Sequence, residues 1–460
     1  MPGYRQLSKN RDFTVLWIGD TASELGSTLS MFVFPLIAYA LSGSALTAAV
    51  VEAAYLGGLC ATLLPAGVLA DRVDRKRIML ASSATGLVSY ASLATAGALG
   101  SLTLPHLVAV ALVSGVAAGA FDPAQLSAIR SVVSTEDLPT ALSQNQARQH
   151  VASLLGGPLG GALYAVTRWL PFAVDSLTYA IACVTVSRVR TDLSAPHRRH
   201  EPLRQQLTEG FRFMWARPFF RTLMTWSSLA NLVVNALFFV VVLRMVAAGV
   251  PAAQIGLVST AAGVGGILGA MIAPSLIHRM PTGRLTVLIG WMCCLPLVPL
   301  TLSDSVWTAC ASTFFLLLLN PVGNAGISSY RMAVTPAHLQ GRVGSTSQFV
   351  SMSVMPLAPL LGGWLLEHQG GTTAITVLVV ASALLALLLT ASRSIRSVPR
   401  PSEWVLEDAP PVSTRVAASP WGSGGAGGGT PGAVGCRPGP GTAICHWTTP
   451  AGRLRGCRGS

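Results

Sequence analysis

The sequence predicts an all-helical membrane protein with twelve transmembrane helices in two six-helix bundles. Three observations predict this class. Of the 460 residues, 51% are hydrophobic and 11% are charged, and the mean hydropathy is +0.56, so a soluble chain of this length would expose large apolar patches. Long apolar runs recur along the chain, and the short segment 71–77 between two of them carries six charges. Lysine and arginine concentrate in alternate connecting segments.

The transmembrane segments follow from the lengths of the apolar runs, because about 20 mostly apolar residues cross roughly 30 Å of hydrocarbon. The runs are too long and too continuous for the strands of a membrane barrel. The predicted helices cover residues 13–41, 45–68, 77–98, 103–128, 145–167, 169–188, 221–246, 254–277, 284–303, 305–329, 344–366 and 371–391.

The orientation follows from the charges outside these segments. The first apolar run is about 30 residues long and lacks a small-residue cleavage pattern, so it predicts a membrane anchor rather than a removable signal. With the N-terminus inside, 29 of the 31 lysines and arginines lie on the inner side, and Arg168 and Arg244 lie outside. One helix more or fewer would destroy this asymmetry, so both termini are predicted to be cytoplasmic. The net charge of +13 then reflects topology, and we expect no nucleic-acid partner.

The chain is expected to divide into four parts. These are an N-terminal bundle at 1–188, a cytoplasmic linker at 189–220, a C-terminal bundle at 221–395 and a disordered, Pro/Gly-rich tail at 396–460. The linker is rich in arginine. The spacing of its apolar residues predicts either an amphipathic helix on the inner membrane surface or a solvated connection.

An internal repeat relates the two predicted bundles. Comparing the halves at an offset of 201 residues pairs Arg130 with Arg331, Leu138 with Leu339, Pro158 with Pro359 and Gly161 with Gly362. Parallel repeats of six helices are typical of secondary transporters, whose substrate path lies between the two halves near the middle of the membrane.

The charged turn at residues 67–77 reads GVLADRVDRKR. So many charges cannot enter hydrocarbon, so the turn marks one membrane face. The segment resembles the Gly-x-Leu-Ala-Asp-Arg-x-Gly-Arg-Lys/Arg signature of the major facilitator superfamily, which lies between the second and third helices of that family. Asp74 stands where the signature has its second glycine.

This resemblance implies a cytoplasmic gating motif. Its predicted members are Gly67, Asp71, Arg72, Arg75, Lys76, Asp122 and Arg130. The resemblance implies that Asp71 meets the positive end of the eleventh helix, and that Arg75 pairs with Asp122 on the fourth helix. A helix N-terminus carries about half a positive charge and favours a nearby carboxylate. Closing the cytoplasmic side would form this contact, and opening would break it.

Further short stretches narrow the resemblance to the branch that holds enterobactin-exporter-like and macrolide-efflux-like proteins, and it covers about residues 10–395. They are residues 16–27, 35–36, 43–44 and 121–124, Asn145 with Arg148, and a helix-five run of Gly157, Pro158, Gly160 and Gly161. This run also resembles a motif of drug and proton antiporters. Its small residues allow close helix contact, and its proline weakens the helix so that it can bend. Simple tight packing is the alternative interpretation.

Intramembrane acids are the candidates for proton coupling, because an ionised carboxylate in hydrocarbon must be paired, hydrated or protonated. Asp20 and Glu24 share one face of the first helix at depths of about 10 and 16 Å. Glu52 reaches a similar depth on the second helix. We predict that Glu24 carries the proton and that Asp20 and Glu52 are coupled or substrate-charge sites. The alternative for each acid is a hydrogen-bonded tie between helices, the role expected for Asp175 and Arg148.

The sequence therefore predicts a secondary active transporter that exports an amphipathic small molecule, such as a drug or antibiotic, in exchange for protons. The resemblance implies a multi-pass protein of the bacterial plasma membrane. A narrow-specificity exporter of a siderophore or another natural product is the alternative. A membrane-embedded enzyme or receptor is disfavoured, and the sequence has no phosphate-binding loop for ATP-driven pumping.

The expected partners are the lipid bilayer, the small-molecule substrate and protons, and we expect a monomer. Five cysteines lie in apolar runs, and the three in the tail have spacings unlike those of a zinc module. The sequence therefore predicts no disulfide framework, no metal and no cofactor.

Overall fold

A computed structural model of the chain describes residues 7, 9–70, 73–134, 136–194, 203–336 and 339–404. Asp71 and Arg72 of the predicted gating motif lie outside the described residues, as does most of the predicted tail. Throughout the described ranges the regular secondary structure is helical.

The first group of helices comprises α2 (Arg11–Ser42), α3 (Ala45–Ala70), α4 (Arg75–Ala98), α5 (Leu104–Val132), α6 (Leu138–Val166) and α7 (Leu170–Ser187). Helix α8 (Leu203–Trp215) follows in the predicted linker. The second group comprises α9 (Pro218–Ala247), α10 (Ala252–Arg279), α11 (Thr282–Met292), the 3-10 helix η1 (Leu295–Thr301), α12 (Val306–Leu318), α13 (Asn320–Ala333), α14 (Gln340–Ser353), α15 (Leu357–Gln369), α16 (Gly371–Ala391), α17 (Arg393–Arg396) and η3 (Pro401–Glu403).

Eleven helical spans in the described part are long and apolar enough to cross a membrane. Each corresponds to one of the twelve predicted segments. The remaining prediction, residues 145–167, falls on α6, which is a helix of 29 residues but is polar in its first half. The count of twelve transmembrane helices and the cytoplasmic position of both termini therefore remain predictions.

Three of the spans are not continuous α-helices, a feature that the lengths of the apolar runs do not indicate. The span of α11 continues as η1, which contains Pro296 and Pro299. One residue separates α12 from α13, next to Pro321. A short turn that includes Pro356 separates α14 from α15. Proline lacks a backbone N–H and clashes with the preceding turn, so it interrupts regular helical hydrogen bonding.

Helix boundaries have local causes in the sequence. The side chain of Asn10 accepts a hydrogen bond from the Phe13 backbone N at 3.1 Å and caps the N-terminus of α2. Gly43 adopts a φ of 68°, which ends α2 in the left-handed conformation that glycine tolerates best. Asp74 accepts from the Lys76 backbone N at 2.9 Å and caps α4.

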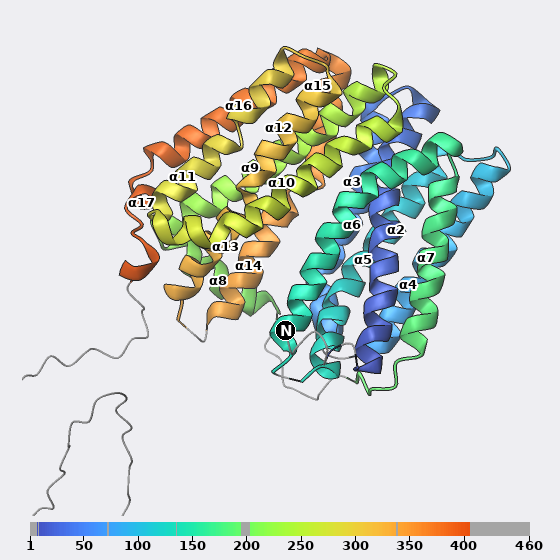
Figure 1. Ribbon diagram of the computed structural model, residues 1–460, viewed down its shortest axis with the longest axis horizontal. Helices are drawn as coiled ribbons and strands as arrows, with labels where there is room; N and C mark the ends of the chain where they lie inside the picture. Colours follow the sequence, from blue (N-terminus) through green and yellow to red (C-terminus); the bar gives the residue numbers. More distant parts are fainter. Residues whose placement is uncertain are drawn as a thin grey trace, which may run out of the picture. The chain divides into compact units, whose positions relative to one another are not determined.

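The helices of each group pack together (Figure 1). In the first group, hereafter the first bundle, α3 packs on α5, and α7 packs on α2 and α4. Its core contains Phe34, Tyr90 and Phe172, and the Phe34 and Phe172 rings lie 5.6 Å apart. In the second group, hereafter the second bundle, α9 packs on α15 and α16, and α10 packs on α12. In a membrane such packing replaces the hydrophobic effect as the main force between helices.

The two bundles meet along two pairs of helices, α6 with α10 and α3 with α15. Both pairs contain glycines at the contact. An added Cβ at Gly161 would lie 2.3 Å from the carbonyl oxygen of Ala252, and one at Gly363 would lie 2.6 Å from the Cβ of Ala49. Only glycine permits this approach, so the bundles touch backbone to backbone at Gly161, and the Gly363 backbone meets the Ala49 methyl group.

Candidate functional site

A buried ion pair lies inside the first bundle. Asp20 on α2 and Arg148 on α6 are 3% and 5% exposed, and Arg148 Nη1 lies 3.6 Å from Asp20 Oδ2. Gln125 on α5 donates from Nε2 to the same oxygen, so three helices meet at this carboxylate. Arg148 Nη2 donates to Asn145 Oδ1 at 2.6 Å. The predicted interhelical tie at Arg148 therefore exists, and its partner is one of the predicted coupling acids.

This pair is incompletely satisfied. Among the described residues, Asp20 Oδ1 and Arg148 Nε have no hydrogen-bond partner. An unmet hydrogen bond costs free energy in a low-dielectric interior.

Two further carboxylates accompany the ion pair. Glu24, one helical turn from Asp20, is half-buried and lies within the electrostatic reach of Arg148. Asp122 on α5 is exposed and interacts electrostatically with Glu24 and Arg148. Asp20, Glu24, Asp122, Gln125 and Arg148 are named the acid cluster below. Three carboxylates in it share one guanidinium.

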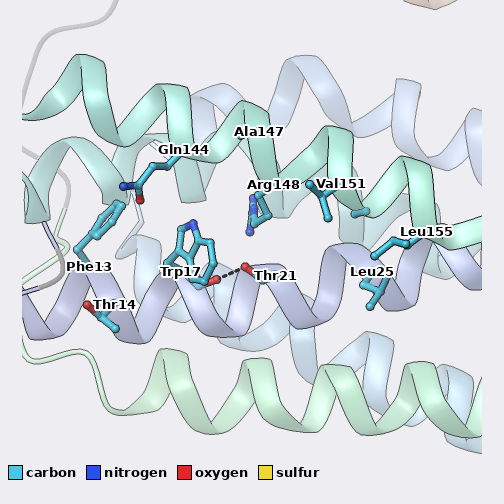
Figure 2. A pocket seen from close by; sticks show the side chains of 11 residues that line it. Phe13, Thr14, Trp17, Thr21, Leu25, Gln144, Ala147, Arg148, Val151 and Leu155 are labelled. Carbon is cyan, nitrogen blue, oxygen red and sulfur yellow. Dashed lines mark hydrogen bonds between the residues drawn. The ribbon is translucent and has the colours of Figure 1, made fainter. Parts of the chain in front are cut away.

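A cavity of about 640 Å³ between α2 and α6 adjoins the acid cluster. Figure 2 shows Trp17 and Thr21 of α2 facing Arg148 and Val151 of α6. The Thr21 hydroxyl donates to the Trp17 carbonyl at 2.6 Å. Arg148 is the one charged residue among those that line this cavity, and most of the others are apolar. An amphipathic molecule here would contact apolar walls beside a buried ion pair.

A second cavity, of about 670 Å³, lies between the bundles. Gln146, Gln149 and His150 line it from α6, opposite Pro274 and Ile277 of α10. The polar half of α6 therefore faces a cavity on each side, which accounts for the polar residues in this predicted membrane segment. Backbone and polar groups at membrane depth are tolerated where they line a water-filled cavity.

The predicted helix-five run lies where α6 meets α10. An added Cβ at Gly157 would lie 2.8 Å from the Cβ of Ser259. Gly160 faces α2 instead, and a Cβ added there would lie 3.2 Å from the carbonyl oxygen of Leu29. Pro158 lies between them inside the helix. The run thus holds α6 against both a helix of its own bundle and a helix of the other.

The described part of the predicted gating motif differs from the expectation in one respect. Arg75 Nη1 donates to Ser131 Oγ at 2.9 Å. Ser131 is nine residues beyond Asp122 on α5, a separation of about 13 Å along the helix axis. The predicted pairing of Arg75 with Asp122 is therefore wrong, because the guanidinium reaches the end of α5 and Asp122 lies deeper, in the acid cluster.

Among the other described members of the motif, Lys76 makes a hydrogen bond that holds the turn in place. Gly67 lies near the end of α3, and Arg130 is exposed in the last turn of α5. Lys76 Nζ donates to the Val189 carbonyl at 2.7 Å, which connects the start of α4 to the segment after α7. Asp74 caps α4, so the residue that departs from the family signature has a structural role.

Two other acids contrast with each other. Glu52 on α3 is half-buried, and no hydrogen bond or ion pair joins its side chain to another described residue. Asp175 on α7 is fully buried and accepts from Ser30 Oγ at 2.5 Å and from Thr178 Oγ1 at 3.1 Å. Asp175 is thus the interhelical tie that was predicted. Sequence reasoning missed Gln125, because nothing in its local pattern indicates a neighbour on α2.

Two packed helical bundles with cavities and buried charges inside the membrane span have the architecture of a membrane transporter. A family model described as Major Facilitator Superfamily matches residues 16–359, and the chain belongs to that superfamily. Its family and fold are those of transporters rather than enzymes.

The curated relatives include efflux proteins. The chain is 26% identical over 372 residues to the Multidrug efflux pump Tap of Mycolicibacterium fortuitum, a match that covers 75% of this chain and 87% of that protein. It is 25% identical over 351 residues to the Enterobactin exporter EntS of Shigella flexneri, with 75% and 83% covered. These similarities confirm the predicted branch and indicate a multi-pass protein of the bacterial plasma membrane.

Solved structures share the fold at low sequence identity. A bacterial homologue of the human lysosomal transporter Spinster, in an inward-facing and unoccupied conformation, has a TM-score of 0.65 at 14% identity and covers 84% of this chain and 97% of its own. The nucleoside transporter NupG has a TM-score of 0.63 at 13% identity, with 83% and 98% covered.

Proposed function

We propose that this protein is a secondary active exporter that expels an amphipathic small molecule in exchange for protons by alternating access. Its relatives named as an efflux pump and an exporter support the direction of transport. The apolar cavity beside Arg148 supports an amphipathic substrate.

The acid cluster is the observation that carries proton coupling. Three carboxylates share one guanidinium there, and Asp20 is the one paired with it. Glu24 has no such partner among the described residues, so it must be hydrated or protonated within the membrane. We therefore assign proton uptake to Glu24. Protonation would reduce the pull of Glu24 on Arg148 and so change the strength of the Arg148–Asp20 pair. A ligand or proton shifts a conformational equilibrium only through such a difference between the two states.

Glu52 is a second candidate in this proposal. It lies on α3 between two contacts with the second bundle, since Ala49 packs against Gly363 and Cys60 Sγ donates to the Met352 carbonyl at 3.2 Å. A change in its charge would act directly on that interface. We assign it a coupling or substrate-charge role, subordinate to that of Glu24.

The orientation of the conformational change follows from the charged ends of the helices. We propose that the end of the molecule with Asp74 is cytoplasmic, because lysines and arginines concentrate there. Helices α6 and α10 are in contact from the level of Gly161 and Ala252 to the level of Leu154 and Gly263. Beyond that level, toward the Asp74 end, the same two helices enclose the inter-bundle cavity. With this orientation the contact closes the outer side and the cavity opens toward the cytoplasm. In this proposal Asp71, which the structure does not describe, would form the opposite, cytoplasmic contact.

The experiment measures protons and substrate together. Energised inverted vesicles with the full-length protein are challenged with macrolides, lipophilic cations and siderophores, and proton release is recorded for wild type and Glu24→Gln. We expect substrate-dependent proton release in wild type and a loss of at least about tenfold in Glu24→Gln, as for removal of an essential proton carrier. Asp192→Asn, an exposed acid after α7, is the matched control and should behave as wild type.

The outcomes separate the alternatives. Proton release that survives in Glu24→Gln but not in Asp20→Asn or Glu52→Gln would move the role to that acid. Transport of a compound without proton movement would refute antiport. Release with siderophores alone would favour the narrow-specificity exporter, a reading that the similarity to EntS keeps open.

A further inference from the structure

A polar cavity in the second bundle contains an arginine without a carboxylate partner. Arg331, near the end of α13, donates from Nη1 to Ser347 Oγ at 2.6 Å, and its Nη2 lies 3.5 Å from Ser328 Oγ. Among the described residues no acidic side chain pairs with it. Four other arginines of the described part each pair with a carboxylate, namely Arg77 with Asp74, Arg148 with Asp20, Arg244 with Asp304 and Arg342 with Glu209. Arg331 is half-buried, and the described side chains that hydrogen-bond to its guanidinium are neutral hydroxyls.

The cavity at Arg331 has a volume of about 440 Å³ and no acidic residue among those that line it. One part of its wall is polar, with hydroxyl and amide groups from three helices: Ser227 and Asn231 of α9, Ser328 of α13, and Ser347, Gln348 and Ser351 of α14. Another part is apolar and polarisable, with Met224, Trp226 and Met352. The cavity therefore has the two-sided chemistry of a site for an amphiphile.

Several donors in this wall are available to a ligand. Among the described residues, the Asn231 side chain has no hydrogen-bond partner, and Gln348 Nε2 has only the sulfur of Met352 at 3.8 Å. A guanidinium offers five N–H groups in a fixed fork that matches carboxylate, phosphate and sulfonate groups. Arg331 uses a minority of these in its two contacts with serine.

This cavity lies next to the cavity between the bundles. Asn324 and Ser328 line both the Arg331 cavity and the inter-bundle cavity. A molecule that moves between the bundles would meet Gln146, Gln149 and His150 of α6 on one side, and Asn324 and Ser328, which also line the Arg331 cavity, on the other.

We propose that Arg331, with Ser347, Asn231 and Gln348, binds the anionic group of the transported amphiphile, while the Met and Trp side chains hold its apolar part. This inference rests on the proposed function, and it adds the substrate class, an amphipathic anion. The same chemistry would bind the headgroup of an anionic lipid, so the test separates these two sources. The simple structural alternative is that Arg331 only ties α13 to α14 through Ser347.

The test uses two probes that share a ring system and differ by one charge. The amphipathic anion 1-anilinonaphthalene-8-sulfonate and its neutral counterpart N-phenyl-1-naphthylamine are bound to the full-length protein in phosphatidylcholine nanodiscs, without a proton gradient. Saturable binding is measured by fluorescence after subtraction of empty nanodiscs. The proteins are wild type, Arg331→Gln, Arg331→Lys, Ser347→Ala and Arg393→Gln, the last an exposed arginine on α17.

We expect Arg331→Gln to weaken binding of the sulfonate by about tenfold or more, as for loss of a charged hydrogen bond, and to leave binding of the neutral probe unchanged. Arg331→Lys should recover part of the loss, and Arg393→Gln should match wild type. Ser347→Ala breaks the tie to α14 and removes one polar group but keeps the charge, so it should weaken sulfonate binding less than Arg331→Gln does and retain the preference for the sulfonate.

Three results would overturn the inference. Equal loss of both probes in Arg331→Gln and Ser347→Ala would assign Arg331 to structure alone, and unchanged sulfonate binding in Arg331→Gln would exclude the site. Phosphatidylglycerol that stays bound to wild type in native mass spectrometry, is lost from Arg331→Gln and displaces the sulfonate would assign the site to a lipid headgroup. Because binding is measured without a gradient, failure of proton release in vesicles would refute antiport and leave this inference intact.

Discussion

The carboxylate of Glu367, at the end of α15, accepts a hydrogen bond from the backbone N of Leu46 in the first turn of α3 at 2.8 Å. It also accepts one from Ser44 Oγ at 2.6 Å, and Ser44 itself caps α3 by accepting from the Thr47 backbone N at 3.1 Å. A carboxylate of one bundle therefore lies on the positive N-terminus of a helix in the other. The family resemblance implies the same type of contact for Asp71 and the eleventh helix, at the opposite end of the molecule. Both contacts would join α3 to the span α14–α15. In the observed contact α15 supplies the carboxylate and α3 the helix N-terminus, and in the implied contact the carboxylate follows α3 and the N-terminus is that of the eleventh helix.

Glu367→Gln is expected to weaken closure at this end. The glutamine amide oxygen still accepts a hydrogen bond, but the negative charge that the helix N-terminus favours is gone. Loss of this charge interaction costs about 1 kcal/mol, which corresponds to about a fivefold shift in the ratio of the two conformations. Pulsed electron paramagnetic resonance between labels at Ser101 and Ala248, in a background without native cysteines, should show a larger population at long distance. The control is Glu403→Gln in η3, at the other end of the second bundle. Identical distance distributions in wild type and Glu367→Gln would contradict a latch.

Gly161→Ala is expected to force α6 away from α10. The new methyl would lie 2.3 Å from the carbonyl oxygen of Ala252, a backbone atom that cannot rotate away. Overpacking of this kind costs about 1–3 kcal/mol, and the cost falls on the conformation in which the two helices touch. Substrate transport should fall, because the transport cycle needs the conformation in which the two helices touch. The protein should still fold, because the clash is absent from the conformation in which they are apart.

The matched control for Gly161→Ala is Gly266→Ala on α10. No atom lies within 4 Å of the Cβ that this change adds, so transport and thermal stability should equal those of wild type. Accessibility of single cysteines near Ala252 to a membrane-impermeant maleimide distinguishes the two variants. Equal accessibility in both would show that the α6–α10 contact does not gate the path.

The fold could be predicted largely from hydropathy and charge, because length and polarity decide whether a helix can cross a bilayer. The polar half of α6 shows what hydropathy leaves unexplained. Gln146, Arg148 and Gln149 lie in a predicted membrane segment, and the reason for their polarity is tertiary, since they line cavities on both faces of the helix. The breaks at η1 and before α15 required knowledge of how individual prolines are accommodated.

The candidate site was predictable by residue type but not by partner. Asp20, Glu24 and Asp122 were recognisable as acids between apolar runs, yet their proximity depends on how α2, α5 and α6 pack. Family resemblance assigned Asp122 to Arg75, whereas the geometry gives Arg75 to Ser131. Arg331 was visible as the repeat partner of Arg130, but the fact that no acid in the described part of the chain faces it is a property of the folded second bundle.

Asp74 provides a test of the departure from the family signature. Asp74→Ala should destabilise the start of α4 by about 1 kcal/mol, because the Lys76 backbone N loses its cap. Asp74→Gly should cost only a few tenths of a kcal/mol. The exposed Asp74–Arg77 pair adds little to either value. The unfolding free energy in mixed micelles measures the difference. A larger loss in Asp74→Gly than in Asp74→Ala would mean that backbone freedom, rather than capping, decides the stability of this turn.

The buried pair of Asp20 and Arg148 predicts strong non-additivity. Arg148→Gln or Asp20→Asn alone removes one charge and leaves the other buried without its partner, which costs about 3–5 kcal/mol. The double variant removes both charges, so its loss of stability should be well below the sum of the two single losses. The control cycle uses Arg244 and Asp304, whose side chains are 19% and 61% exposed, where coupling should not exceed about 1 kcal/mol. Additive losses at Asp20 and Arg148 would show that the two charges are separately solvated, and Asp20 could then no longer respond to the charge of Glu24 through Arg148.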